Sequence, residues 1–486
     1  MTTTAATPMP SDSRQQATLE RATELALAYL ESLDDAPVCA TTQLAELRRR
    51  FGRPLTDQGT DPVAVVDELA RAAEGGLLGN AGGRFYGWVI GAGLPSALAA
   101  DWLTGTWDQN AGLYACGPAA AVVEEVCGTW LKDLLGLPES ASFALVTGCQ
   151  MAHVTCLAAA RHAVLTRAGW DVNRDGLSGA PRVRLLTSSE VHGTMTRAAK
   201  LLGIGTSNIA VLPSDSAGRL APGDLRAALS QEPERPSVVV LQAGDVNCGV
   251  FDPFPELIGL AHDANAWVHV DGAMGLWCNA VPELRHLLAG AEGADSWATD
   301  GHKWLNVPYD SGYAFVAHPE HHRAAMEHRA SYLVHADEVR DQLDWTPEHS
   351  RRARGFATWA ALRELGRTGL ADLILRCCRH AYDIVTRIGT LPNAHAVCVP
   401  QINQGLVRFH DVRPGASEED HDRRTDQVMA AINASGEAFF TGTTWRGRRC
   451  MRVSVSSWRT TADDVDRAVA AAERALPHSD GDRSPG

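Results

Sequence analysis

The middle of the chain alternates between short apolar runs and stretches with apolar residues at helical spacing. The runs are typical of buried strands, and the spaced stretches are typical of helices that cover a sheet. Strands are predicted at 142–147, 182–187, 237–242, 266–271 and 312–317, and helices at 118–135, 151–165 and 194–202. Strands that alternate with helices imply right-handed crossovers and a mainly parallel sheet covered on both faces. The predicted fold class is therefore α/β.

The two ends of the chain show different patterns. Apolar residues at helical spacing over 17–33 and 61–74 predict a helical segment that must pack on the rest of the protein or on a second subunit. Toward the other end, helical stretches at 351–366 and 367–388 precede strands at 404–409 and 449–455 and a helix at 461–476. We expect an N-terminal tail and helical segment (1–80), a large domain (81–345) and a small α+β domain (346–486).

Composition narrows the class of protein. The 486 residues are 45% hydrophobic and 21% charged, as in ordinary globular proteins. A net charge of −14 argues against nucleic acid or an anionic membrane as a partner. No apolar run has the length of a membrane span, and the first residues lack the features of a signal peptide. The 11 cysteines show no CxxC spacing, so we expect reduced thiols, no metal site and a cytoplasmic location.

The stretch DSWATDGHKW at 295–304 places Lys303 between a histidine and a tryptophan. It is too polar for a core strand, and Trp297, Trp304 and Leu305 are expected to exclude water from the lysine. Desolvation lowers a lysine pKa and exposes a nucleophilic amine, which can form a Schiff base with an aldehyde cofactor. The alternative is a lysine at a loop edge with its stem on a tryptophan face.

Asp271 strengthens the interpretation of Lys303. It ends an apolar strand, and open α/β sheets bind ligands at the carboxyl ends of their strands. A carboxylate there can keep the ring nitrogen of pyridoxal 5′-phosphate (PLP) protonated, so that the ring accepts electrons. Taken alone, a strand that ends in aspartate is explained equally well by an aspartate that only caps the following turn. A strand-end aspartate followed 32 residues later by a His-Lys pair is more specific than either feature.

A strand followed by a small-residue turn and a helix is the third feature. The strand at 142–147 leads into Gly148, Cys149 and Gln150 and then into a helix. This order directs backbone N–H groups and the helix dipole at an anion. Because Cys149 and Gln150 carry no hydroxyl group, the backbone donors are the expected contacts.

The segments HVDGA (269–273), DSWATDGHKW (295–304) and SSEVHGTMTRAAKLLG (188–203) resemble the group II PLP-dependent amino-acid decarboxylases, which include the aromatic L-amino-acid and glutamate decarboxylases. The resemblance covers roughly residues 80 to 475 and implies a fold-type I PLP-dependent architecture and a homodimer. It also implies PLP as cofactor. The positions implied to bind it are Lys303, Asp271, His192, Gly148, Cys149, Gln150, Asn247, Ala273 and His302. Cys149, Gln150 and Asn247 depart from the residue types that are usual in the family.

The resemblance implies roles for several side chains. His192 matches the family's ring-stacking histidine, with a helix cap as the alternative. Tyr332 matches the tyrosine that protonates the substrate carbon after CO₂ leaves, with a loop anchor as the alternative. Asn247 either contacts the ring or substrate or only shapes a turn.

Other residues are candidates for the substrate pocket. Phe85, Trp88 and Trp107 are candidates for the wall of an aromatic or aliphatic pocket, with a glycine-rich loop held by core aromatics as an equally favoured alternative. Arg352 would fix a loop or a carboxylate, with a solvated basic surface as the alternative. We expect Arg351 and Arg354 on a solvated basic surface.

The predicted function is decarboxylation of an L-amino acid, aromatic or otherwise hydrophobic, to its amine and CO₂. One alternative is a decarboxylation-dependent oxidative deaminase that yields an aldehyde, ammonia and peroxide. The other is a non-catalytic family member that acts as a scaffold. His192 together with Tyr332 favours the simple decarboxylase, and the intact pair of Asp271 and Lys303 argues against the scaffold.

Overall fold

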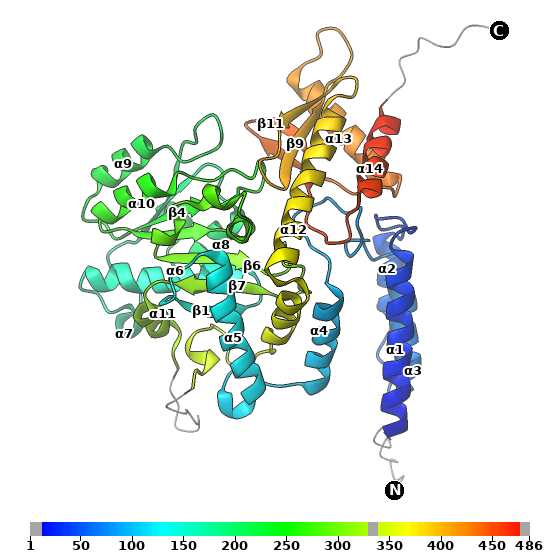
Figure 1. Ribbon diagram of the computed structural model, residues 1–486, viewed down its shortest axis with the longest axis horizontal. Coiled ribbons are helices and arrows are strands. Elements are labelled where there is room, and N and C mark those ends of the chain that lie inside the picture. The colour runs from blue at the N-terminus through cyan, green and yellow to red at the C-terminus, as the bar shows by residue number, and fades with distance from the viewer. Residues whose placement is uncertain (1–11, 329–338, 477–486) are drawn as a thin grey trace, which may run out of the picture.

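The computed structural model describes residues 12–328 and 339–476. A seven-stranded sheet with the order β1-β7-β6-β5-β4-β2-β3 forms the centre of the large domain (Figure 1). Its strands are β1 (Ser142–Val146), β2 (Arg184–Ser188), β3 (Ile209–Leu212), β4 (Ser237–Gln242), β5 (Trp267–Asp271), β6 (Ser296–Asp300) and β7 (Gly312–Val316). Only β7 runs antiparallel to its neighbours, β1 and β6. The predicted mainly parallel α/β sheet is confirmed.

Helices cover both faces of this sheet, and each face has its own apolar core. Along β5, Val268 and Val270 belong to one core and Trp267 to the other, because successive side chains of a strand point to opposite faces. The covering helices are α5 (Pro118–Leu135), α6 (Cys149–Arg167), α7 (Val172–Asp175), α8 (Gly193–Leu201), α9 (Pro222–Gln231), α10 (Phe254–Asp263) and α11 (Pro319–Met326). Short 3₁₀ turns lie at Tyr114–Cys116, Thr206–Asn208, Gly275–Ala280, Arg285–Leu288, Ala291–Gly293 and Gln342–Asp344.

The stretch at 295–304 contains a core strand, so the expectation that it is too polar for one is wrong. All five residues of β6 are buried. Ser296 Oγ accepts a hydrogen bond from Trp267 Nε1 at 2.9 Å, and Trp297 Nε1 donates to the carbonyl of Ala291 at 2.8 Å. Buried polar groups are tolerated when they are hydrogen-bonded, and these two side chains have partners inside the fold.

A second, antiparallel sheet with the order β10-β11-β9-β8 forms the small domain. Its elements are β8 (Ala394–Cys398), β9 (Gln404–Phe409), α13 (Glu418–Ala434), β10 (Thr441–Trp445), β11 (Arg448–Ser454) and α14 (Ala462–Ala475). The long helix α12 (Gly355–Gly389) joins the two sheets and is interrupted at Gly366, where φ is 58° (Figure 1). The predicted strands at 404–409 and 449–455 correspond to β9 and β11, whereas β8, β10 and α13 are additional elements.

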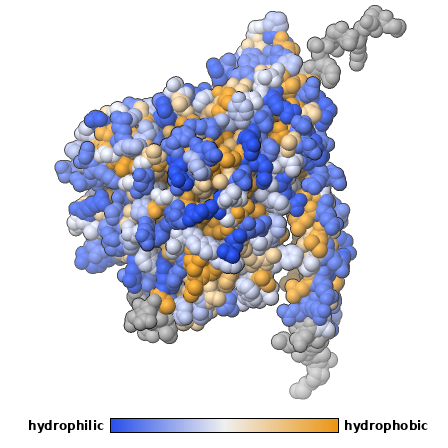
Figure 2. Space-filling model, in the orientation of Figure 1, coloured by the Kyte–Doolittle hydropathy of each residue, from blue (hydrophilic) through white to orange (hydrophobic). Residues whose placement is uncertain are grey.

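The N-terminal helices form a hairpin beside the main body (Figure 1). Helices α1 (Asp12–Ser32) and α3 (Pro62–Ala73) pack together through an ion pair between Arg21 Nε and Asp67 Oδ1 at 2.6 Å. The short helices α2 (Leu44–Phe51) and α4 (Pro95–Trp107) follow α1 and α3, respectively. Apolar side chains remain exposed along the hairpin (Figure 2), among them Leu19, Leu27, Val65 and Leu69. Among the described helices, none has both the length and the apolar character that a membrane crossing requires.

Arg351 and Arg354 are buried, so the expected solvated basic surface is wrong for both. Arg351 Nη1 donates to Glu124 Oε1 of α5 at 2.7 Å, and its Nη2 donates to the carbonyl of Leu145 in β1 at 2.6 Å. Arg354 Nε donates to Asp310 Oδ1 at 3.1 Å. These contacts tie the chain just before α12 to the edge of the large sheet.

Replacing Glu124 by alanine should destabilise the protein by about 3–5 kcal/mol, because the change leaves the Arg351 guanidinium buried without its acid. Both side chains of this pair are 0% exposed. The measurement is urea unfolding followed by fluorescence. Asp101→Ala is the matched control, since it breaks an exposed pair with Arg352, worth about 0–1 kcal/mol. Equal losses in the two variants would contradict this account.

Candidate active site

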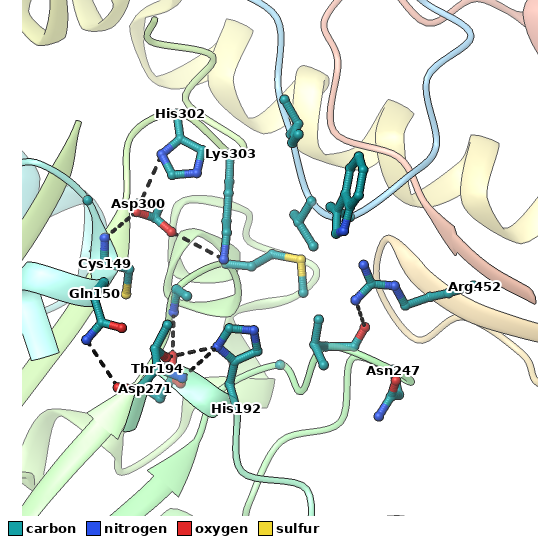
Figure 3. Close-up of a pocket in the computed structure, with 18 of the residues that line it drawn as sticks. Cys149, Gln150, His192, Thr194, Asn247, Asp271, Asp300, His302, Lys303 and Arg452 are labelled. Atoms are coloured by element: carbon teal, nitrogen blue, oxygen red, sulfur yellow. Dashed lines mark hydrogen bonds and ion pairs between the residues drawn. The ribbon is translucent and has the colours of Figure 1, made fainter. Parts of the chain in front are cut away.

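A cavity of about 650 Å³ opens at the carboxyl ends of the parallel strands. Strands β4, β5 and β6 end there in Gln242, Asp271 and Asp300. The turn before α6 and the strands β10 and β11 of the small domain complete the wall. Open α/β sheets bind ligands at this edge, and the volume is in the range of a pocket for small molecules. Figure 3 shows the side chains of Lys303 and Arg452 entering the cavity from different sides.

Lys303 follows β6 and extends over the strand ends (Figure 3). Its Nζ lies 3.3 Å from Asp300 Oδ2, and its side chain is 18% exposed. Burial acts to lower the pKa of Lys303, but the negative charges of Asp300 and Asp271 act against burial and leave this pKa above its ordinary value. The expected lowering of the Lys303 pKa is therefore wrong, because the neighbouring carboxylates outweigh the desolvation.

Asp271 ends β5 at the floor of the cavity and is 5% exposed. Its Oδ1 accepts a hydrogen bond from the backbone N–H of Ala273 at 3.2 Å. Burial acts to raise the pKa of Asp271, but His153, His192 and Lys303 together leave it below its ordinary value. Asp271 is consequently a carboxylate at neutral pH, the form that can pair with a protonated ring nitrogen.

His192 caps a helix, which is one of the two roles that the sequence left open, and its ring stands at the cavity where the other role would be carried out. Its Nδ1 caps α8 by accepting the backbone N–H of Thr194 at 3.3 Å, and the ring also lines the cavity. Burial lowers the pKa of His192, so the imidazole is neutral at pH 7. Because Nδ1 accepts a hydrogen bond, the ring hydrogen is assigned to Nε2.

The turn at Gly148, Cys149 and Gln150 begins α6 and lines the cavity. The backbone N–H of Cys149 donates to Asp300 Oδ1 at 2.5 Å, so the start of this helix already binds a negatively charged group. Gln150 Nε2 donates to the carbonyl of Thr194 at 3.2 Å. Burial keeps the pKa of the Cys149 thiol well above its ordinary value, so the side chain is neutral.

Four more of the predicted residues line the cavity: Trp88, Asn247, Ala273 and His302. The ring of His302 stacks on Tyr309 with 4.3 Å between centroids. Asn247 Oδ1 accepts a hydrogen bond from Thr443 Oγ1 of the small domain at 3.0 Å. The turn itself is shaped by Asp245, which accepts the N–H groups of residues 247, 248 and 250.

Three predicted substrate residues lie outside the cavity wall. Phe85 is buried and stacks on Phe439 with 5.0 Å between centroids. Trp107 ends α4 and makes an edge contact with Phe356, and Arg352 pairs with Asp101 at 2.7 Å on the surface. Tyr332 lies outside the described residues.

The cavity also contains Gln242, Asp300, Arg452 and His153, which the sequence patterns did not single out. Gln242 ends a strand that the sequence predicted, so the rule that identified Asp271 would also have found it. Asp300 was missed because its strand, β6, was expected to be too polar for the core. Arg452 belongs to strand β11 of the small domain and is 8% exposed. Within the described residues, neither Arg452 Nε nor Gln242 Nε2 has a hydrogen-bond acceptor.

One group of side chains has the spacing of metal ligands. Cys149, His153 and Asp271 each offer an atom within 4.8 Å of the others. The Cys149 side chain is a neutral thiol here, whereas the thiolate is the form that binds metals. Asp271 is the member of this group that carries a negative charge.

The residues present fit PLP. Lys303 offers an amine to an aldehyde, Asp271 offers a carboxylate to a ring nitrogen, and the start of α6 offers backbone N–H groups to a phosphate. The buried Gln242 Nε2 and Arg452 Nε add two donors in the same wall that still lack acceptors among the described residues. The carboxylate of Asp300 is the one group that a phosphate would have to displace.

This lysine and this aspartate, at the carboxyl edge of a mainly parallel sheet, define a fold-type I PLP enzyme. The sequence profile of the pyridoxal-dependent decarboxylase conserved domain matches residues 88–411, more than half of the chain. The chain belongs to this family of PLP-dependent carboxy-lyases.

Similar proteins cover almost the whole chain. Aromatic-L-amino-acid decarboxylase from Bacillus atrophaeus is 24% identical, with 92% of each chain covered. Tryptophan decarboxylase 1 from Oryza sativa subsp. japonica is 27% identical, with 90% of this chain and 89% of that protein covered. The crystal structure of Oryza sativa TDC with PLP and tryptamine has a TM-score of 0.90 at 24% identity, with 96% of this chain and 99% of that chain covered. This structural likeness supports the fold.

Asp300→Asn should allow Lys303 to react with PLP at lower pH, because the change removes the nearest negative charge that holds the lysine pKa up. The rate of covalent PLP attachment to cofactor-free protein, followed by absorbance from about pH 6 to about pH 10, should shift toward lower pH. Asp310→Asn is the control, since Asp310 pairs with Arg354. A pH profile that matches the unaltered protein would contradict the assignment.

Proposed function

We propose that this chain decarboxylates an L-amino acid with an aromatic or other hydrophobic side chain and releases CO₂ and the amine. The observation that carries the proposal is that Lys303 and Asp271 line the same cavity, where the neighbouring strands β5 and β6 end. The cavity wall also contains Trp88, Val89, Ile90 and Met274, which suit an apolar side chain. Relatives named aromatic-L-amino-acid decarboxylase and tryptophan decarboxylase support an aromatic substrate.

Each of the residues around the cofactor has a distinct role in this proposal. When bound, PLP supplies an electron sink for the pair of electrons that stays on Cα after CO₂ leaves. Lys303 would hold it covalently, Asp271 would accept a hydrogen bond from its ring nitrogen, and the start of α6 would bind its phosphate. His302, Ala273 and Asn247 would complete this wall.

The remaining roles concern the substrate. His192 carries a hydrogen on Nε2 at the cavity, so it can donate to the substrate carboxylate and orient the bond that breaks. Tyr332 would deliver a proton to Cα after CO₂ departs, as a general acid. The unpaired Nε–H of Arg452 would hydrogen-bond a polar group of the substrate or cofactor.

The oxidative alternative rests on relatives. One, 4-hydroxyphenylacetaldehyde synthase from Rhodiola rosea, is 27% identical, with 85% of each chain covered. Having His192 and Tyr332 together in this chain favours simple decarboxylation. Both chemistries share the loss of CO₂ and differ only in what happens afterwards at Cα.

The direct test is a screen of amino acids for CO₂ release by the purified, PLP-loaded protein. Lys303→Ala should reduce turnover at least about 10³-fold, because the other two lysines, Lys132 and Lys200, are not cavity residues. Lys200→Ala is the matched control and should keep full activity. Borohydride reduction and peptide mapping should place the pyridoxyl adduct on Lys303. An adduct on another lysine would overturn the assignment.

Tyr332→Phe should reduce amine formation much more than CO₂ release, by about 10²-fold or more if the hydroxyl is the general acid. A substrate carbon left without this proton can react with oxygen, so the variant should gain aldehyde and peroxide. CO₂, amine and peroxide are measured together, in air and under nitrogen. If the unaltered protein already forms peroxide in step with CO₂, the oxidative alternative is correct. If the variant changes none of the three products, Tyr332 is an anchor.

The active unit should be a homodimer, because the N-terminal hairpin leaves leucine and valine side chains exposed. Light scattering should give twice the chain mass of 52.0 kDa. Leu69→Asp on α3 should weaken the dimer and reduce activity. Leu55→Asp is the control, because Leu55 is fully exposed outside the hairpin helices. A monomer with full activity at nanomolar concentration would contradict this prediction.

A cytoplasmic location also remains a prediction.

A further inference from the structure

A row of buried polar side chains runs from Asp271 into the core between the sheet and α6. His153 Nε2 lies 3.5 Å from Asp271 Oδ2, and His153 Nδ1 lies 3.0 Å from His269 Nε2. His269 Nδ1 lies 2.9 Å from Ser296 Oγ. The four residues are at most 5% exposed, so water does not replace these contacts. The role proposed for Asp271 does not by itself account for two histidines behind it.

The partners determine which ring nitrogens carry hydrogen. Burial lowers the pKa of both histidines, so each imidazole is neutral and carries one hydrogen. An ionised carboxylate accepts but does not donate, so the favourable arrangement turns the Nε2–H of His153 toward Asp271. His153 Nδ1 must then accept from His269 Nε2–H, and His269 Nδ1 accepts from the Ser296 hydroxyl. The hydrogen bonds from Ser296 through His269 to His153 consequently leave the Nε2–H of His153 facing the carboxylate of Asp271, 3.5 Å away.

The nearest competing acceptor is Cys149. Its Sγ lies 3.4 Å from the same His153 Nε2. A thiol is a weak acceptor and a weak donor, whereas the carboxylate carries a full charge in a buried setting. The charge of Asp271 therefore dominates the orientation of His153.

We propose that His153 is a positioning residue for Asp271. His269 and Ser296 hold the ring of His153 so that its Nε2–H faces the carboxylate, and this N–H group keeps Asp271 ionised. The proton shared between Asp271 and the ring nitrogen of bound PLP then stays on the nitrogen. The proposal rests on the proposed function, since the ring nitrogen is present only with PLP. It assigns a role to a histidine four residues after Cys149 on α6.

The surroundings of Asp271 show why such a donor matters. Burial raises the pKa of Asp271, and His153 is the largest of the neighbouring influences that oppose it. The other titratable groups that face this carboxylate or His153 are His192 before α8, His269 on β5, Cys149 on α6, and Asp300 and Lys303 at the end of β6.

The test measures where the shared proton lies. Holoenzyme is prepared with PLP labelled with ¹⁵N in its ring, and the ¹⁵N chemical shift distinguishes a protonated from a neutral ring nitrogen. In His153→Leu, the ratio of protonated to neutral nitrogen at pH 7.5 should fall about tenfold, the change produced by one unit of pKa. The dissociation constant of PLP should rise by a similar factor.

Conservative and control variants separate positioning from packing. His153→Gln retains an N–H group near the position of Nε2 and should keep the ratio within about threefold of the unaltered enzyme. His322→Leu removes a histidine that is equally buried but bonds to Ser142 and the carbonyl of Trp345, so it should leave the ¹⁵N shift unchanged. Ser296→Ala should shift this ratio in the same direction as His153→Leu but by a smaller factor. It provides the test of the proposal if His153→Leu does not fold.

The outcomes distinguish this proposal from the proposed function. Failure of the unaltered protein to bind PLP covalently would overturn the proposed function. If the unaltered enzyme binds PLP covalently and releases CO₂, the proposed function stands. If His153→Leu and Ser296→Ala then show the same ¹⁵N shift as the unaltered enzyme, only the role of His153 is overturned. Imidazole ¹⁵N spectra of the unaltered holoenzyme give an independent check: both histidines should be neutral with hydrogen on Nε2, and hydrogen on His153 Nδ1 instead would reverse the direction of these hydrogen bonds and overturn the proposal.

Discussion

The parallel pairing of β5 with β6 is the constraint on which the candidate site depends. His269 lies opposite Ser296 and Asp271 opposite Ala298, so the two strands end side by side. The carboxylate of Asp271 and the residues that follow β6, including Lys303, therefore share one edge of the sheet. A shift of one residue would turn each side chain of β6 to the opposite face and remove Ser296 from His269. The apolar cores on both faces oppose such a shift.

The charges at this edge balance one another in a buried setting. Asp271 and Asp300 are both close to Lys303, and Asp300 also caps α6 through the N–H of Cys149. In this structure the lysine is therefore a paired ammonium, and a carboxylate occupies the start of α6. Lys303 would hold PLP covalently, and the start of α6 would offer its N–H groups to the phosphate in place of Asp300. The cofactor-free site is thus organised by the same groups that would hold the cofactor.

The small domain is part of the site because β10 and β11 close one side of the cavity. Arg452 comes from β11, and Thr443 on β10 donates a hydrogen bond to Asn247 of the large domain. The kinked helix α12 joins the two sheets, and the buried pair of Arg351 and Glu124 fixes the chain just before it. Residues far apart in sequence thereby meet around one cavity of fixed shape.

Local patterns in the sequence were sufficient for the α/β sheet, for most strands and helices of the large domain, and for Lys303 and Asp271, because apolar periodicity and strand-end polar residues are local signals. They failed where burial depends on distant partners. β6 is a core strand because Ser296 bonds to Trp267, and Arg351 is buried because Glu124 lies beside it. The burial of Lys303 beside both Asp300 and Asp271, and the row from Asp271 through His153 to His269, were decided by tertiary structure, since both depend on distances between groups that the fold brings together from different strands and helices.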